Sequence, residues 1–202
     1  MKGNVIIVSA PSGAGKTSLV RELIARDPAT RKSISYTTRQ LRPGEKNGHD
    51  YHFVDARTFE GMLEGGEFLE SAKVHGNMYG TGQKWVEEQR AQGNDIVLEI
   101  DWQGAKQVRG LMPEAIGIFV LPPSLEALHG RLKKRAQDSE AVITARLVAA
   151  RSEVAHVHEF DYVIINDRFD DAVEDLISIV RSTRLRLATQ LDRNQALINS
   201  LK

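Results

Sequence analysis

The residues from Ser9 to Thr17, with the sequence SAPSGAGKT, have the types and spacing that bind a chain of phosphates. They follow an apolar run and open a stretch of helical periodicity, which is the context that a phosphate-binding loop requires. Gly13 and Gly15 would let backbone N–H groups approach phosphate oxygens, and the start of the helix would add the positive end of its dipole. Lys16 can reach the β- and γ-phosphates of ATP, and Thr17 offers a hydroxyl group to Mg²⁺. The pattern therefore predicts an ATP site with Mg²⁺ as its cofactor.

The expected ATP site comprises this loop and the first residues of the helix. Its members are Ala10, Pro11, Ser12, Gly13, Ala14, Gly15, Lys16, Thr17 and Ser18. Ala10 stands where the strict motif has its first glycine, at a position that makes a tight turn rather than a phosphate contact. The alternative is a glycine-rich turn that contains Lys-Thr by chance. The order of strand, loop and helix favours the phosphate site.

A phosphate loop of this kind works with an acidic residue at the end of a neighbouring strand. Glu99 and Asp101 follow the apolar run 96–98 and are two candidates. The alternative is that one of them caps the next helix while the other is solvated. Beside the phosphate loop, a functional role for at least one of them is the favoured interpretation.

A second group of anion-binding residues lies between positions 35 and 45. Ser35, Arg39 and Arg42 place a hydroxyl group and two guanidinium groups close together. Planar guanidinium donors suit a phosphate monoester, which offers several acceptor oxygens. In isolation the stretch would be read as a basic surface hairpin.

Several motifs, in order along the chain, resemble those of the guanylate kinases, specifically the compact bacterial enzymes. They are Ser-Gly-Ala-Gly-Lys-Thr, Thr-Thr-Arg-x-x-Arg-x-Gly-Glu, Asp-Tyr-x-Phe, Gly-Asn-x-Tyr-Gly, Ile-Asp-Trp-Gln-Gly, Pro-Pro-Ser and Ile-Asn-Asp. The resemblance runs from Val5 to about Leu187. It implies transfer of the γ-phosphate of ATP to GMP, giving ADP and GDP. It also implies a core, a GMP-binding lobe and a lid.

The resemblance also assigns roles to single residues. The GMP phosphate would be held by Arg39, Arg42, Tyr51 and Tyr79, and guanine would be surrounded by Ser35, Glu70, Thr81 and Asp101. The lid and its flanks would supply Arg131, Arg135 and Arg146, and Asn166 would lie near the adenine. Catalytic roles are expected for Lys16, Arg39, Arg131, Arg135 and Arg146. The chain departs from the family's pattern at Glu99 and Ala136, where aspartate and glycine are usual.

Hydrophobic periodicity predicts the strands and helices that position these residues. Buried strands are expected at 5–9, 95–100, 115–121 and 162–165, with helices at 17–25, from 103 and from 170. This alternation predicts an α/β fold of P-loop NTPase type, with a mostly parallel sheet covered on both faces. A single domain is expected over 1–202. Its core comprises 1–32, 83–124 and 159–202, its partly antiparallel GMP-binding lobe comprises 33–82, and its helical lid with flanking helices comprises 125–158.

Composition narrows the possible partners. Lys plus Arg and Asp plus Glu both number 27, so bulk binding to nucleic acid or to an anionic membrane is not expected. The absence of cysteine excludes thiol chemistry, and no apolar run reaches the ~20 residues of a membrane span. The expected partners are ATP and GMP, and the expected location is the cytoplasm. The sequence does not indicate an oligomeric state.

Two other functions compete with this interpretation. The first is a kinase on the same scaffold that acts on another nucleotide or on a sugar phosphate, which would not need the base-reading groups of Glu70 and Ser35. The second is a non-catalytic, peptide-binding module of the same fold. The intact glycines of the loop, together with Lys16 and Thr17, argue against a non-catalytic module.

Overall fold

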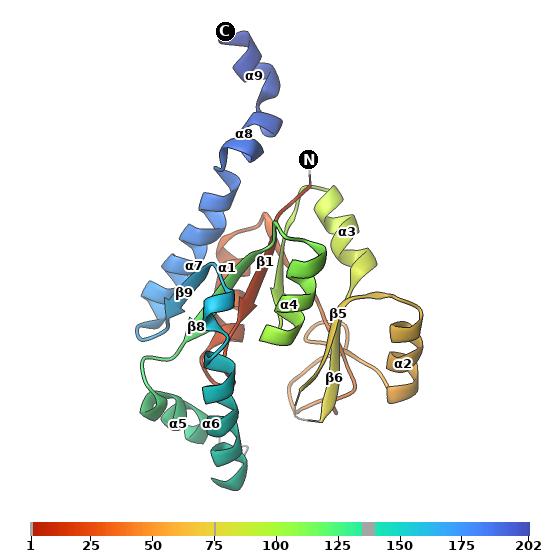
Figure 1. Ribbon diagram of the computed structural model, residues 1–202, viewed down its shortest axis with the longest axis vertical. Coiled ribbons are helices and arrows are strands. Elements are labelled where there is room, and N and C mark those ends of the chain that lie inside the picture. Colours follow the sequence, from red (N-terminus) through yellow and green to blue (C-terminus); the bar gives the residue numbers. More distant parts are fainter. Residues whose placement is uncertain (1, 75, 135–139) are drawn as a thin grey trace.

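The computed structural model describes residues 2–74, 76–134 and 140–202, and its largest sheet has five parallel strands in the order β2-β7-β1-β8-β9. The strands are β1 (Val5–Ser9), β2 (Thr30–Lys32), β7 (Asp95–Glu99), β8 (Ile116–Leu121) and β9 (Tyr162–Ile165). Parallel strands need crossover connections, and helices supply them (Figure 1). The predicted α/β fold with a parallel core is confirmed.

Helices cover both faces of this sheet. They are α1 (Lys16–Arg26), α3 (Gln83–Ala91), α4 (Trp102–Leu111) and α7 (Phe169–Arg184). Successive residues of a strand point to opposite faces. Accordingly, Ile6 and Val8 pack with residues of α1 and α7, whereas Val5 and Ile7 pack with residues of α3 and α4. The two groups of buried apolar residues pack against opposite faces of β1, and β1 leads directly into the glycine-rich loop.

Two strands of the sheet differ from expectation. β2 was not predicted, because two of its three residues are Arg31 and Lys32 and the segment has no apolar run. The prediction of a buried strand at 162–165 was wrong about burial. β9 forms an edge of the sheet, where Val163 and Ile165 are about half exposed and only Ile164 is buried.

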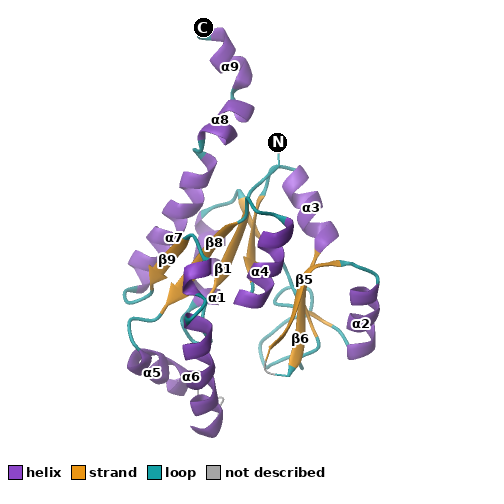
Figure 2. Cartoon of the chain, viewed as in Figure 1, coloured by secondary structure: helices purple, strands orange, loops and turns teal. Residues whose placement is uncertain are grey.

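A second, smaller sheet of four strands lies beside the core (Figure 2). Its order is β4-β3-β6-β5, and its elements are β3 (Tyr36–Thr37), β4 (His52–Phe53), β5 (Phe68–Val74), β6 (Asn77–Gly82) and the neighbouring helix α2 (Ala56–Glu64). The β3–β6 and β5–β6 pairs are antiparallel, and the β3–β4 pair is parallel. The alternating, glycine-rich sequence of this region therefore folds as a mixed sheet.

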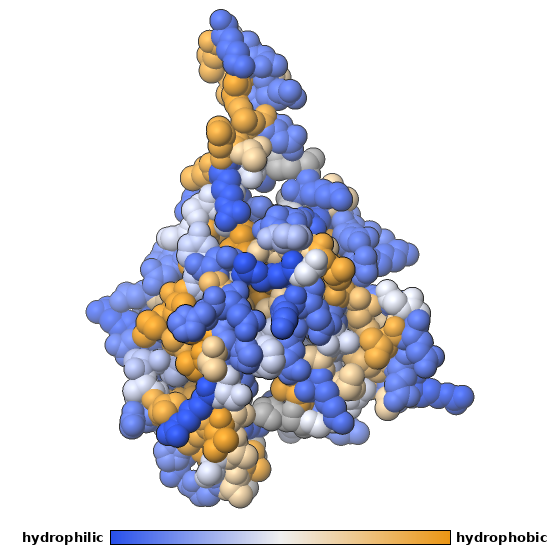
Figure 3. Space-filling view, in the orientation of Figure 1, coloured by the Kyte–Doolittle hydropathy of each residue, from blue (hydrophilic) through white to orange (hydrophobic). Residues whose placement is uncertain are grey.

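Two helices and a terminal extension complete the chain. α5 (Leu125–Lys134) and α6 (Glu140–Val154) form a small core of their own through Leu128, Leu132 and Ile143, and the short helix η1 (Val157–Glu159) follows. The last helices, α8 (Leu187–Arg193) and α9 (Gln195–Ser200), point away from the body (Figure 1). Orange apolar side chains are visible along this extension in Figure 3.

Arg184 ties the end of α7 to two carboxylates, those of Asp27 at the end of α1 and of Asp95 at the start of β7. Its Nη1 lies 2.8 Å from Asp27 Oδ2, its Nε donates to Asp95 Oδ2 at 2.5 Å, and its Nη2 donates to Thr30 Oγ1 at 2.8 Å. Both carboxylates are buried. Arg184→Met should lower the free energy of unfolding by about 3–5 kcal/mol, because removal of one partner leaves buried charge uncompensated.

Urea unfolding of Arg184→Met measures this loss. Arg181→Met, at an exposed position of the same helix, is the matched control and should change the free energy of unfolding by less than about 0.5 kcal/mol. If both variants lose the same small amount, the Arg184 ion pairs do not stabilise the fold.

Candidate functional site

The glycine-rich loop between β1 and α1 has a backbone that only glycine adopts readily at two positions. Gly13 and Gly15 have φ angles of 96° and 101°. A Cβ atom added to Gly15 would also lie 2.3 Å from Nδ2 of Asn166. The loop closes on itself through the N–H of Ala14, which donates to the carbonyl of Pro11 at 3.0 Å. The result is a concave loop at the N-terminus of α1, the geometry that binds phosphate groups.

Lys16 and Thr17 reach from this loop to the end of β7. Lys16 Nζ donates to the carbonyl oxygen of Ile100 at 3.2 Å, and Thr17 Oγ1 donates to Glu99 Oε2 at 3.0 Å. The contact arises because β1 and β7 are neighbours with Val8 opposite Glu99, so their carboxyl ends lie together. Burial lowers the pKa of Lys16, and the negative charges of Glu99 and Asp101 oppose that shift.

Glu99 has the coordination chemistry of a partner for a hard cation. Its Oε1 is buried and accepts no hydrogen bond from the residues that the structure describes, although Lys32 Nζ forms an ion pair with it at 3.1 Å. Together with the Thr17 hydroxyl, it provides the oxygen ligands that Mg²⁺ prefers. No group of three or more His, Cys, Asp or Glu residues that could hold a metal is found in the described part of the chain. A Mg²⁺ ion at this place would therefore be bound mainly by phosphate and water oxygens.

A buried carboxylate in the smaller sheet is a further part of the candidate site. Glu70 of β5 is 4% exposed, and its Oε1 accepts a hydrogen bond from the hydroxyl of Thr81 at 2.6 Å. Burial raises the pKa of Glu70 to about 7. Asp101 raises it further, whereas Thr81 and Lys16 act in the opposite direction. Such a group changes its charge near neutral pH, which is common at functional sites.

Asp101 has both roles that its sequence position allowed. It caps α4 by accepting a hydrogen bond from the N–H of Gly104 at 2.9 Å. It also lines the cleft that contains Glu70 and Ser35. The expectation that one of the two acids caps the next helix is therefore correct for Asp101. The cap does not prevent Asp101 from lining the cleft.

The arginine and tyrosine side chains expected to bind the acceptor phosphate lie in the same lobe as Glu70. Arg39 is held by Glu45 through two hydrogen bonds of 3.0 and 2.8 Å, and its guanidinium group lies 5.3 Å from the ring centroid of Tyr51. Burial raises the pKa of Tyr51 to about 12, so its hydroxyl group stays protonated and can donate a hydrogen bond. A fixed guanidinium group beside a neutral phenol is well suited to bind a phosphate.

One cavity of about 250 Å³ connects the glycine-rich loop to this lobe. Among the residues expected at the site, its lining includes Ala10, Pro11, Ser12, Gly13, Gly15, Lys16, Thr17, Ser35, Arg39, Arg42, Tyr51, Glu70, Tyr79, Asp101 and Arg146. Parts of the chain that are far apart in sequence thus meet in a single cleft.

The other expected residues lie elsewhere. Thr81 is fully buried beside Glu70, and neither Ala14 nor Ser18 lines the cavity. Arg131 donates to the carbonyl oxygens of Asn166 at 2.7 Å and of Ala14 at 3.4 Å, so Arg131 and Asn166 contact the loop outside the cavity lining. Arg135, like Ala136, lies outside the described residues.

Sequence analysis missed two charged residues of the site. Glu153 of α6 lines the cleft, where burial raises its pKa to about 7, and Lys32 pairs with Glu99. Both belong to stretches of mixed charge, and only the fold shows that they face the cleft. No local sequence signal distinguishes Glu153 from the other polar residues of its helix.

Comparison with known proteins identifies the family. The family model described as "Guanylate kinase" matches residues 2–183. The chain belongs to the guanylate kinase family. The guanylate kinases of Methylobacillus flagellatus and Aromatoleum aromaticum are 58% and 56% identical to it, over 100% and 96% of this chain and 100% and 95% of the relatives. The crystal structure of guanylate kinase from Anaplasma phagocytophilum matches with a TM-score of 0.79 and 34% identity, over 92% of this chain and 88% of that chain. The guanylate kinase resemblance and the P-loop NTPase-type fold are both confirmed.

Proposed function

We propose that this cleft transfers the γ-phosphate of ATP to the phosphate of GMP, giving ADP and GDP. The protein is a nucleoside monophosphate kinase, an ATP:GMP phosphotransferase, as its family is. The observation that carries the proposal is the single cavity lined by Lys16 of the glycine-rich loop, Arg39 and the buried Glu70. A phosphate donor and a base-bearing acceptor can bind there end to end.

ATP would be bound by the loop, with its phosphates facing the backbone N–H groups and Lys16. The oxygens of Thr17 and Glu99 fit Mg²⁺, and these residues would hold it at the cleft. When bound, Mg²⁺ neutralises charge on the terminal phosphates of ATP. Asn166 and Arg131, which both donate to the carbonyl oxygen of Ala14, would support the loop from its other side, and Asn166 would lie near the adenine.

The acceptor phosphate would be held by Arg39, Arg42, Tyr51 and Tyr79. One of its oxygens forms a bond to the γ-phosphorus while the bond to the β–γ bridging oxygen breaks, and ADP leaves with that electron pair. The attacking oxygen is already anionic, so the reaction needs no general base. The task of the protein is to align two anions and to neutralise their charge, which Lys16 and Arg146 can do.

Guanine would be recognised by hydrogen bonds to its edge. Its N1–H and 2-amino groups are donors, and a carboxylate only accepts, so Glu70 can pair with both. Asp101 would take a second hydrogen of the 2-amino group, and Ser35 would donate to O6. Thr81 would act through Glu70, because its hydroxyl group fixes one carboxylate oxygen.

The chain would work as one domain with moving parts. Residues 33–82 would form the acceptor lobe and 125–158 the lid with its flanks, bringing Arg131, Arg135 and Arg146 to the phosphates, while the rest forms the core. Closure would exclude water and so prevent hydrolysis of ATP. No described helix is long and apolar enough to cross a bilayer. The cytoplasm, the site of the nucleotide pools, is the location we propose.

A coupled assay of product formation tests this function. With ATP, GMP and Mg²⁺, ADP and GDP should appear in equal amounts, and addition of EDTA should stop the reaction. Formation of ADP without GDP would indicate hydrolysis and would refute the proposed transfer.

The affinity for GMP should rise with pH around neutrality. Below about pH 7, Glu70 carries a proton in the free enzyme and cannot accept both guanine donors, whereas above it the carboxylate is available. The affinity should therefore fall by up to about tenfold for each pH unit below the pKa. Calorimetric titration between about pH 6 and pH 8 measures this dependence.

Glu70→Gln is the control for this pH series, because GMP has a titrating phosphate of its own. The variant should retain only the part of the pH dependence that the phosphate contributes. Identical pH profiles for both proteins would show that Glu70 does not control guanine binding.

A further inference from the structure

Glu153 is a carboxylate in the nucleotide cleft that phosphate binding does not explain. It belongs to the last turn of α6 and lines the same cavity as Lys16, Asp101 and Arg146. A cleft that aligns two anionic nucleotides is helped by positive charge, and an added carboxylate repels their phosphate groups. The role of Glu153 should therefore concern a part of the substrate other than phosphate.

The packing of α6 fixes which side of the helix faces the cleft. Ile143 and Ala150 are buried against α5, and each is followed three residues later by a residue that lines the cleft, Arg146 and Glu153. These two lie seven residues apart, so they share one side of the helix at a separation of about 10 Å along its axis. Glu153 is at the end of α6 that leads into η1 and β9, next to the core.

The charges near Glu153 place it on the acceptor side of the cleft. Burial raises its pKa to about 7; Lys16 opposes this shift and Asp101 adds to it. Asp101 also acts on Glu70, the residue expected to read the base. Glu99, at the expected Mg²⁺ position, acts on Lys16 but is not among the described groups that act on Glu153. Glu153 therefore lies on the side of Asp101 and Glu70 rather than beside the metal.

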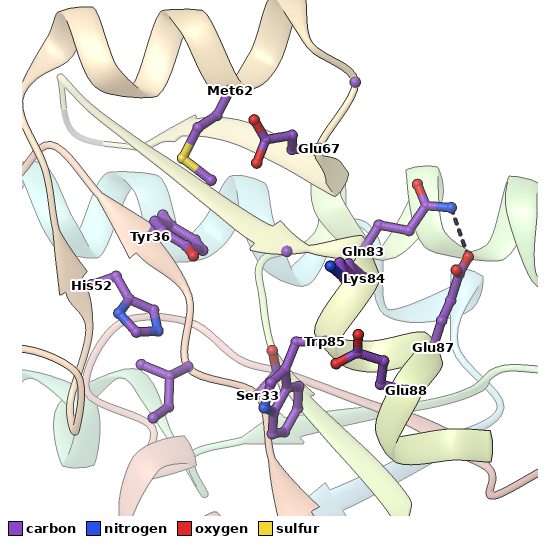
Figure 4. A pocket seen from close by; sticks show the side chains of 13 residues that line it. Ser33, Tyr36, His52, Met62, Glu67, Gln83, Lys84, Trp85, Glu87 and Glu88 are labelled. Atoms are coloured by element: carbon purple, nitrogen blue, oxygen red, sulfur yellow. Dashed lines mark hydrogen bonds between the residues drawn. The ribbon is translucent and has the colours of Figure 1, made fainter. Parts of the chain in front are cut away.

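The carboxylate of Glu153 has acceptor oxygens available for a substrate. It is half-buried, and among the described residues it takes part in no side-chain hydrogen bond or ion pair. The acids around the separate cavity of about 670 Å³ in Figure 4 differ in this respect, because Glu67, Glu87 and Glu88 are all exposed and water solvates them. A half-buried carboxylate has less access to water, so a hydrogen-bond donor in the cleft is its natural partner.

The hydrogen-bond donors of GMP show which group remains for Glu153. The N1–H and the two hydrogens of the 2-amino group of guanine are taken by Glu70 and Asp101 in the proposed function. The acceptor phosphate, as a dianion, only accepts. The donors that remain are the 2′- and 3′-hydroxyl groups of the ribose. Two neighbouring hydroxyl groups match the two oxygens of one carboxylate.

We propose that Glu153 accepts hydrogen bonds from the 2′- and 3′-hydroxyl groups of the acceptor ribose and so favours ribonucleotides over deoxyribonucleotides. The inference rests on the proposed function, because it takes GMP as the acceptor. The ribose of ATP is not the partner. Lys16 faces the terminal phosphates of ATP, and Asn166, proposed near the adenine, contacts the glycine-rich loop outside the cavity lining.

Kinetics with GMP, dGMP and 2′,3′-dideoxy-GMP test this contact in the wild-type protein and in Glu153→Ala. The wild-type protein should lose about tenfold or more in kcat/KM for each hydroxyl group removed, the scale of a hydrogen bond to a charged acceptor. Glu153→Ala should use GMP and dGMP within about twofold of each other, because the hydroxyl group and the side chain form a double-mutant cycle. The variant should use 2′,3′-dideoxy-GMP at least as well as the wild-type protein does, since no contact is lost.

Two further variants and a binding measurement identify the cause. Glu153→Gln keeps one acceptor oxygen and should show an intermediate preference for GMP over dGMP. Arg151→Ala, at an exposed position in the same turn of α6, should keep the wild-type preference. Calorimetric titration with GMP and dGMP in the absence of ATP measures the preference in binding, so it tests the contact even if no phosphate is transferred. Equal affinity of the wild-type protein for GMP and dGMP, or an equal loss for all three acceptors in Glu153→Ala, would overturn the proposal.

Discussion

Lys16→Ala should lower turnover of ATP and GMP by roughly 10²-fold or more, the scale of losing one preorganised electrostatic contact in a transition state. Lys16 is the ammonium group that leaves the glycine-rich loop toward the shared cavity, next to Glu99 and Asp101. Among the described residues it donates one hydrogen bond, to the carbonyl oxygen of Ile100. The ammonium group of Lys16 is therefore held in place and has N–H donors that phosphate oxygens can accept from.

The fold should survive this change. Loss of one partly buried hydrogen bond costs about 1 kcal/mol, and removal of a buried charge offsets part of it. Steady-state kinetics and thermal unfolding should be measured together, with Lys106→Ala on the exposed side of α4 as the lysine control. If Lys16→Ala keeps near-normal turnover, the loop does not neutralise the transferring phosphate.

Glu70→Gln should lower kcat/KM for GMP by at least roughly 10²-fold, because two hydrogen bonds to a charged acceptor are lost or replaced by a donor–donor contact. The ratio of kcat/KM for GMP to kcat/KM for AMP should also fall. Adenine has an acceptor at N1, which the carboxylate of Glu70 repels and an amide N–H can meet. The hydroxyl of Thr81 can still donate to the amide oxygen of the introduced glutamine, so the local structure should be retained.

Kinetics with GMP, IMP and AMP measure this effect in the wild-type protein and the variant. IMP lacks the 2-amino group and should fall between the other two. Glu64→Gln, an exposed residue of the same lobe, should leave all three values unchanged. An undiminished preference for GMP in Glu70→Gln would show that another group reads the base.

The phosphate loop and the core sheet were the most predictable parts of the molecule. An apolar run, two glycines and Lys-Thr specify strand, loop and helix locally, and β1 (Val5–Ser9) has the bounds expected from its sequence. The acids at the end of β7 were also predictable, because parallel neighbouring strands bring their carboxyl ends together. In each case the information lies within a few residues.

Other features depend on tertiary structure and were not visible in the sequence. β2 is a strand because it pairs with β7, and its own residues are largely charged. Glu153 belongs to the site because α6 borders the cleft, and Lys32 because β2 ends beside Glu99. Glu70 was found only through the family resemblance, since a single glutamate in an alternating stretch has no signal of its own.

The most direct test of the account is a competition assay in which wild-type protein, Mg²⁺ and ATP meet equal concentrations of GMP and AMP. The account predicts that GDP is formed from GMP and that AMP is used less well by several orders of magnitude, up to roughly 10⁴-fold, because the buried Glu70 carboxylate accepts from guanine and cannot pair with adenine N1. Comparable formation of ADP from AMP, or hydrolysis of ATP with neither monophosphate phosphorylated, would contradict it.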